Sequence, residues 1–170
     1  EKMAIYNLRV EPDRGRSAVY RYEYTLRVND FSWEKDSKYD DFLFGQNVNM
    51  PDFASEDPKL FWESCENYER ANANTFRTID FSLPTELSDE ENIELAARFA
   101  EELFGDKFVY SMAVHSKPSG VQSIQNIHCH IMFSERKLDG IERDSKEFFK
   151  RFNRKNPQLG GCEKTDEWTA

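Results

Sequence analysis

Alternating apolar and polar positions predict four β-strands in this chain. The clearest is 126–134, where every second side chain is apolar from Ile127 to Phe133 and the two histidines, His128 and His130, alternate with them. Residues 76–83 show the same alternation before Pro84. The remaining predicted strands are residues 3–10 and 107–115. Each strand is therefore expected to have one face in a core and one face that carries polar groups.

Helical spacing of apolar residues predicts helices over residues 16–27, 58–74, 88–104 and 144–152. Ser88 followed three residues later by Glu91 forms a capping box, and Gly105 is suited to end the same helix. Residues 29–57 are polar and rich in turn formers. We expect them to form a long excursion with at most a short helix, which is a common place for a binding loop.

The order of elements predicts a layered α/β (α+β) domain, with a central antiparallel sheet and helices packed on one face. The 170 residues suffice for one domain over 1–170. Glu1 and Lys2 precede Met3, the expected natural start, and we expect the domain to be the N-terminal part of a longer protein. No apolar run is long enough to span a membrane, and no secretory signal is visible. Three widely spaced cysteines favour a reducing, cytoplasmic location.

The net charge of −9 argues against indiscriminate binding of nucleic acid. The charge is unevenly distributed, however. Residues 31–106 carry a net −13, whereas residues 1–30 carry +1 and residues 107–170 carry +3. A phosphate-binding face is therefore compatible with the composition if the acidic stretch lies mostly away from it.

The three histidines of the chain, His115, His128 and His130, fall within 16 residues. His128 and His130 are two apart in a predicted strand, so both face the same side, and His115 ends the preceding strand. Three neutral imidazoles at one point would form a metal site. The alternative is that they are ordinary exposed or core histidines. Cys129 should point into the core, so it is not counted as a ligand.

Three tyrosines, Tyr20, Tyr22 and Tyr24, lie within five residues of a predicted helix. They are candidates for aromatic packing or for a nucleophilic phenol. A phenol is a weak nucleophile at neutral pH, and a cation bound to a phosphodiester would make the phosphorus more reactive toward it. Asp80 lies on the polar face of its strand. It could orient a ligand histidine, accept the tyrosine proton, or be a solvated carboxylate.

Several blocks in order resemble the MobA/MobL relaxases of the HUH endonuclease superfamily. They are MAIYNLRV, the GRSA turn, YERANANTFRTIDFSLPTEL, YSMAVH, NIHCHIMFSERKLDGIER, FFKRFN and GGCEKT. The resemblance implies a palm with an antiparallel sheet and the metal site on its open face. It also implies site- and strand-specific nicking and rejoining of DNA at a plasmid origin of transfer, through a covalent 5′-phosphotyrosine intermediate, for conjugative mobilisation.

By the same resemblance, Tyr24 falls on the nucleophile position and the three histidines fall on the metal-ligand positions. Asp80 is retained as a catalytic candidate because Thr78 occupies a position that is often acidic in relatives. The cofactor would be one divalent ion, Mn²⁺ or Mg²⁺ first, with Zn²⁺, Ni²⁺ and Cu²⁺ as alternatives. Partners would be single-stranded DNA at the origin, accessory mobilisation proteins and a coupling protein, with no membrane segment.

Basic residues near the tyrosines and after the histidine strand could neutralise DNA phosphates. They are Arg14, Arg16, Arg21, Arg27, Arg136, Lys150, Arg151 and Arg154. Three alternatives stay open at this point: a rolling-circle replication initiator with the same chemistry, a non-catalytic metal-containing DNA-binding module, and a metal hydrolase that uses a bound water. Tyr20 and Tyr22 stay open as alternatives to Tyr24 for the nucleophile.

Overall fold

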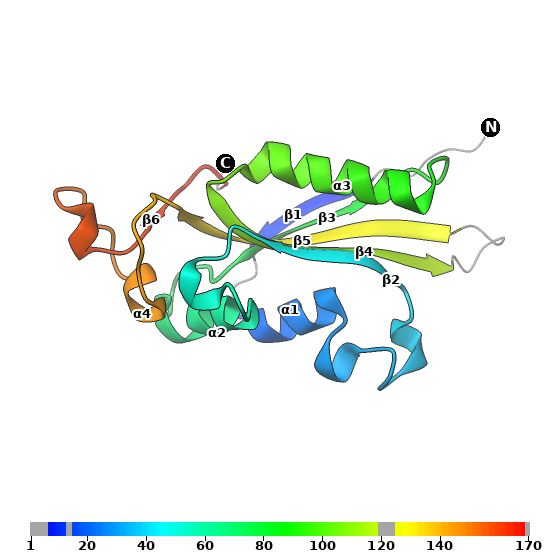
Figure 1. Ribbon diagram of the computed structural model, residues 1–170, viewed down its shortest axis with the longest axis horizontal. Coiled ribbons are helices and arrows are strands. Elements are labelled where there is room, and N and C mark those ends of the chain that lie inside the picture. The colour runs from blue at the N-terminus through cyan, green and yellow to red at the C-terminus, as the bar shows by residue number, and fades with distance from the viewer. Residues whose placement is uncertain (1–6, 13–14, 119–124, 169–170) are drawn as a thin grey trace.

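The computed structural model describes residues 7–12, 15–118 and 125–168. An antiparallel sheet with the strand order β1-β3-β5-β4-β2 runs through the molecule, and β6 pairs with the far end of β5 (Figure 1). The strands are β1 (Leu8–Pro12), β2 (Phe42–Val48), β3 (Arg77–Ser82), β4 (Phe108–Pro118), β5 (Gln125–Lys137) and β6 (Glu163–Lys164). The predicted antiparallel sheet of an α+β domain is confirmed.

Helices cover both faces of the sheet, in contrast to the predicted single face. Figure 1 shows α3 (Asp89–Phe104) on one side and α1 (Ala18–Leu26) with α2 (Lys59–Tyr68) on the other. Two buried clusters separate accordingly, one that includes Ile131 and Phe104 and one that includes Met132 and Trp62. The prediction of one covered face is wrong because Met132 and Val109, which point away from α3, also need a hydrophobic partner.

Local signals place the two helices that matter most here. The Ser17 side chain accepts a hydrogen bond from the Tyr20 N–H and so caps α1, which lies within the predicted helix 16–27. Arg27 ends α1 in the left-handed conformation. Helix α3 begins with the predicted capping box of Ser88 and Glu91 and ends before Gly105. No helix in the part of the chain described here is both long and apolar enough to cross a bilayer.

The excursion 29–57 contains a strand that the sequence pattern did not predict. Strand β2 forms the edge beside β4, and the turns η1 (Asn29–Phe31), η2 (Ser37–Tyr39) and η3 (Asp52–Ala54) occupy much of the rest. Alternation is weak in β2 because nearly all of its residues are partly buried and Gly45 interrupts it. The predicted helices 58–74 and 144–152 shorten to α2 and to α4 (Ser145–Phe148). The part of the predicted strand 3–10 before residue 7 lies outside the described residues.

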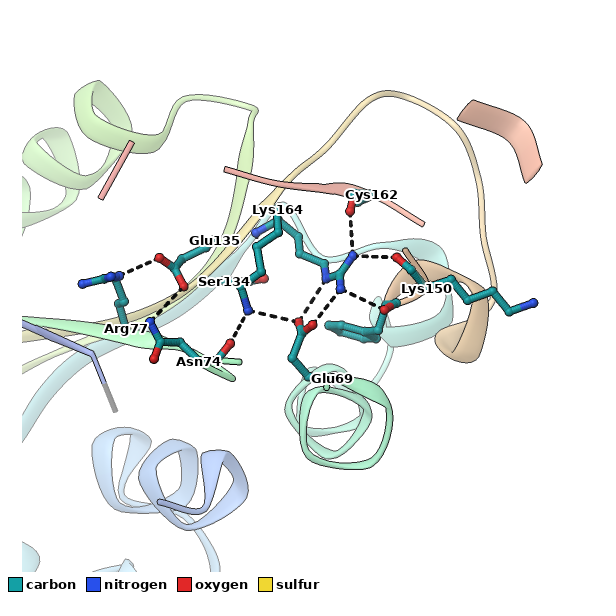
Figure 2. A network of polar contacts seen from close by, with 10 residues as sticks. Glu69, Asn74, Arg77, Ser134, Glu135, Lys150, Cys162 and Lys164 are labelled. Atoms are coloured by element: carbon teal, nitrogen blue, oxygen red, sulfur yellow. Dashed lines mark hydrogen bonds and ion pairs between the residues drawn. The ribbon is translucent and has the colours of Figure 1, made fainter. Parts of the chain in front are cut away.

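A buried arginine holds the C-terminal segment against α2. The Arg136 guanidinium forms two hydrogen bonds with the Glu69 carboxylate, of 3.0 and 2.6 Å. It also donates to the backbone carbonyls of Phe149, Lys150 and Cys162 at 2.7–2.9 Å (Figure 2). The prediction that Arg136 contacts DNA is therefore wrong, because its five N–H groups are used inside the fold.

Replacement of Arg136 by glutamine should leave Glu69 buried without its main partner. We expect the free energy of unfolding to fall by about 3–5 kcal/mol, because removing one member of a buried ion pair leaves an uncompensated charge. Arg98→Gln, on the exposed surface of α3, should change it by less than about 0.5 kcal/mol. Urea unfolding measures both variants. A loss below about 1 kcal/mol for Arg136→Gln would contradict the structural role.

Candidate active site

The sheet register brings the three histidines together on the face covered by α1 and α2. His115 of β4 pairs with His128 of β5, and His130 lies between Ala113 and Asp80. The ring centroids of His115 and His130 are 4.8 Å apart, and those of His128 and His130 are 6.1 Å apart. Cys129 points to the opposite side and is fully buried in the α3 core. Because side chains alternate between the two faces of β5, His128 and His130 lie on one face and Cys129 lies in the hydrophobic core on the other.

His115 is the innermost of the three, with 1% of its surface exposed. Its Nε2 lies 2.7 Å from the carbonyl oxygen of Thr25, at the end of α1. Because a carbonyl only accepts, Nε2 carries the hydrogen and Nδ1 is the bare nitrogen. Burial, with the charges of His130 and Arg27, lowers the pKa of His115 to about 3. The ring is therefore neutral at ordinary pH.

Asp80 connects the histidine strand to α1. One of its oxygens lies 2.6 Å from Nδ1 of His130, and the Arg21 guanidinium contacts both oxygens at 3.0 and 3.3 Å. Burial acts to raise the pKa of Asp80, but His130 and Arg21 outweigh it and lower the pKa below its usual value. The ionised carboxylate thus holds His130 by Nδ1 and leaves its Nε2 available.

A second arginine of α1 makes a parallel connection to His115. Arg27 binds the buried Asp41 through two hydrogen bonds of 2.8 and 3.0 Å. Its Nη2 lies 3.4 Å from Nδ1 of His115, and Nη1 donates to the Tyr24 carbonyl. Asp41 immediately precedes β2, and no sequence motif singled it out. The predicted phosphate contact of Arg27 is wrong for this structure, since Asp41 already neutralises its buried guanidinium.

The donor chemistry fits a divalent metal ion, but the side chains as placed do not yet form a complete ligand set. Burial lowers the pKa of His128 as well as that of His115, so both imidazoles are neutral, the form in which a histidine can bind a metal. Nevertheless, the described residues contain no group of three His, Cys, Asp or Glu side chains arranged to hold a metal. His128 and His130 are partly exposed, whereas His115 is buried and both of its ring nitrogens contact protein atoms, the Thr25 carbonyl and the Arg27 guanidinium.

The three tyrosines have different surroundings. Tyr22 is buried in the core against α2, and burial raises its pKa while a hydrogen bond with Asn47 acts in the opposite direction. Tyr20 is 59% exposed and stacks on Tyr24. Tyr24 is half-buried, and the Arg27 guanidinium carbon lies 4.4 Å from its ring centroid. Arg27 thereby links the Tyr24 ring to His115.

Two further aromatic side chains enclose Tyr24, and sequence reasoning missed both. Phe31 packs edge-on against Tyr24 and Tyr20, with ring centroids 5.4 and 5.0 Å apart. Tyr39 packs against Tyr24 and Phe31 at 6.3 and 5.5 Å. These residues belong to η1 and η2 in the excursion 29–57. The expectation of a binding loop there was the only signal that pointed to them.

The other predicted DNA contacts lie in three places. Arg14 is outside the described residues, and Arg16 is exposed before α1. Arg21 is occupied by Asp80. Lys150, Arg151 and Arg154 are exposed near α4, at the end of the sheet away from the C-terminal end of β4, and Lys150 pairs with Glu147 (Figure 1). Their position separates them from the histidines and Tyr24.

Comparisons with known proteins agree on one family. The model of the MobA/MobL family matches residues 16–168. The chain is 39% identical over 155 residues to the 43 kDa relaxation protein of Salmonella typhimurium, covering 91% of this chain and 41% of that protein. It is 36% identical over 168 residues to Mobilization protein A of Escherichia coli, covering 96% and 22%. It therefore spans less than half the length of these relatives.

The fold also matches a solved structure. A chain described under the words "Molecular Basis of Vancomycin Resistance Transfer in Staphylococcus aureus" superposes with a TM-score of 0.64 and 25% sequence identity, covering 81% of this chain and 73% of that chain. The family match extends over α1, the histidine strands and the C-terminal segment. This chain belongs to the MobA/MobL family.

Proposed function

We propose that this chain is the relaxase domain of a plasmid mobilisation protein. It would cut one DNA strand at an origin of transfer and later rejoin it. The observation that carries the proposal is the connection from Tyr24 through Arg27 to His115, together with the family match. Arg27, paired with Asp41, thereby holds a phenol and neutral imidazoles on one side of the sheet, and these would supply a nucleophile and nitrogen ligands for a cation that activates the phosphate.

In this mechanism the Tyr24 oxygen attacks the phosphorus of the scissile phosphodiester. The P–O3′ bond breaks, the Tyr24 hydroxyl gives up its proton and the leaving 3′ oxygen takes one up to become a hydroxyl, and the 5′-phosphate remains bonded to Tyr24. The new phosphotyrosine conserves the diester, so the reverse reaction rejoins the strand without an external energy source. Tyr22 is unsuited to this role because it lies in the core.

The proposed roles of the site residues follow from their contacts. His115, His128 and His130 would hold one divalent ion, which polarises the phosphate and stabilises its developing negative charge. To bind the ion, His115 would have to break the Nε2 hydrogen bond to the Thr25 carbonyl or turn its bare Nδ1 away from Arg27. Asp80 is a positioning residue for His130 in this scheme, because its contacts with His130 and Arg21 favour that role over accepting the tyrosine proton.

Tyr24→Phe should abolish covalent capture of DNA, because the ring remains but the attacking oxygen is lost. Single-stranded oligonucleotides tiling a candidate origin, incubated with Mn²⁺ or Mg²⁺, would be examined on a denaturing gel for a protein-linked fragment. Tyr20→Phe and Tyr22→Phe are the matched controls and should still form the adduct. If the adduct were lost only in Tyr20→Phe or only in Tyr22→Phe, that tyrosine would be the nucleophile in place of Tyr24.

The same gel separates the alternatives. Cleavage without an adduct would point to a metal hydrolase that activates water, and binding without cleavage would point to a non-catalytic DNA-binding module. A rolling-circle initiator would form the adduct at a replication origin instead of a transfer origin. Accessory mobilisation proteins and a coupling protein are proposed partners of the whole protein.

Removal of the metal should stop cleavage and leave the fold intact. We expect chelation to abolish the adduct and added Mn²⁺ to restore it, with His128→Ala and His130→Ala each losing Mn²⁺ binding by calorimetry. Asp80→Asn should weaken Mn²⁺ binding by about 10–100-fold, since an amide orients the His130 imidazole less well than the carboxylate does. Ser116→Ala, next to His115, is the control. Full cleavage in metal-free protein would overturn the metal role.

Phe31→Ala should slow cleavage, because Phe31 packs on the Tyr24 ring and fixes where the phenol points. We expect the single-turnover rate to fall by about 10–100-fold, as displacement of a reacting group by about 1 Å can do, with little change in DNA affinity. Phe31→Tyr keeps the ring and should restore most of the rate. An unchanged rate in Phe31→Ala would show that α1 alone positions Tyr24.

A further inference from the structure

A polar pocket lies at the end of the sheet opposite Pro118 and Gln125, where β4 ends and β5 begins. It has a volume of about 380 Å³ and lies between the end of α2, the start of β6 and the segment after α4. Arg70, Arg151 and Phe152 line its rim, and Glu69, Arg136 and Lys164 line its floor. Neither the catalytic proposal nor the family match assigns a role to this pocket.

The floor of this pocket is fixed by buried hydrogen bonds. The side chains of Arg136 and Glu69 are only 4% and 2% exposed, and the carbonyls that Arg136 binds belong to the segment that carries Arg151 and Phe152. Figure 2 shows Lys164 reaching Glu69 and the Asn74 carbonyl from the opposite side. The rim residues are therefore mounted on a rigid base, and the pocket exists before any ligand arrives.

The charges of the pocket favour an anion. Four cationic and two acidic side chains line it, in a chain whose net charge is −9. The Glu69 charge is already met by Arg136 and Lys164. Arg70 and Arg151 are exposed, and neither guanidinium has a hydrogen-bond or ion-pair partner among the described residues. Two uncommitted guanidiniums on one rim can bind a phosphate through several N–H groups at once.

Phe152 adds a planar apolar surface between these cations. Its ring is half-buried and belongs to neither hydrophobic core of the described residues. An aromatic ring beside arginines is the combination that binds single-stranded nucleic acid, since bases stack on the ring while guanidiniums neutralise the backbone. A simple anion site would have no use for this ring.

We propose that this pocket binds one nucleotide of single-stranded DNA, with the base on Phe152 and its phosphate on Arg70 and Arg151. The choice of DNA as ligand rests on the proposed function. Arg136 reaches α2, the helix on the histidine face, and lies six residues along β5 from His130. At ~3.3 Å per residue the pocket is about 20 Å from the histidines. One strand would then be held at two points several nucleotides apart.

The test measures DNA binding in a protein that cannot cut. Fluorescence anisotropy with a labelled single strand of about 20 nucleotides, on the Tyr24→Phe background without divalent ions, keeps the result independent of the cleavage chemistry. Phe152→Leu retains apolar volume and removes the ring, and should weaken binding by about tenfold. Arg70→Gln with Arg151→Gln should reduce the slope of log K against log salt by about 0.7, because the one phosphate that the two arginines neutralise is lost.

Arg98→Gln on α3 is the matched control for Arg70→Gln and Arg151→Gln taken singly, each of which also removes one positive charge, and it should leave affinity and slope unchanged. Titration with deoxyadenosine monophosphate, followed by NMR, should shift the Phe152 ring signals and the amides of Arg151 and Gly161. Inorganic phosphate should shift the amides alone. Together these results would support a nucleotide site.

Three outcomes would overturn the proposal. The first is an unchanged affinity and salt slope in Phe152→Leu and in the double arginine variant. The second is an equal loss in Arg98→Gln, which would show a general effect of net charge. The third is identical shifts with phosphate and with the nucleotide, which would indicate an anion site that does not read the base.

Discussion

The site depends on two arginine–aspartate pairs that fasten one short helix to the histidine strands. Arg21 binds Asp80, which holds His130, and Arg27 binds Asp41 beside His115. Each carboxylate lies on a different side of the histidine pair, so the two pairs fix α1 at both ends. The helix is only nine residues long, and a helix of this length has little stability of its own. Its position, and with it that of Tyr24, is therefore set by charge pairing and by packing against α2.

The part of this site that the sequence could predict is the part that depends on local periodicity. A strand alternates its side chains between two faces, so H-C-H alone places two imidazoles on one side and Cys129 in the core. The cap at Ser17 and the capping box at Ser88 are equally local, and both helices begin where these residues indicate. Tyr20 and Tyr24 share a face because they are four residues apart.

What the sequence could not predict depends on which distant segments meet. The residue type alone does not show whether an arginine binds DNA or a buried carboxylate. Arg27 and Arg136 were expected at a DNA interface and instead bind Asp41 and Glu69 inside the fold. Strand β2 escaped detection because its place beside β4 buries it partly on both faces. Phe31 and Tyr39 reach Tyr24 only because the chain returns toward α1 before it enters β2.

The uneven charge along the chain becomes intelligible once the two faces of the sheet are distinguished. Helix α3 carries six acidic residues and one arginine, and it covers the face opposite the histidines (Figure 1). Much of the negative charge of residues 31–106 is thus kept away from the side where a phosphodiester would bind, which reduces repulsion of DNA. The same stretch nevertheless supplies Phe31, Tyr39 and Asp41 to that side. The net charge of a sequence segment hides this division, because residues that are close in the sequence lie on opposite faces of the sheet.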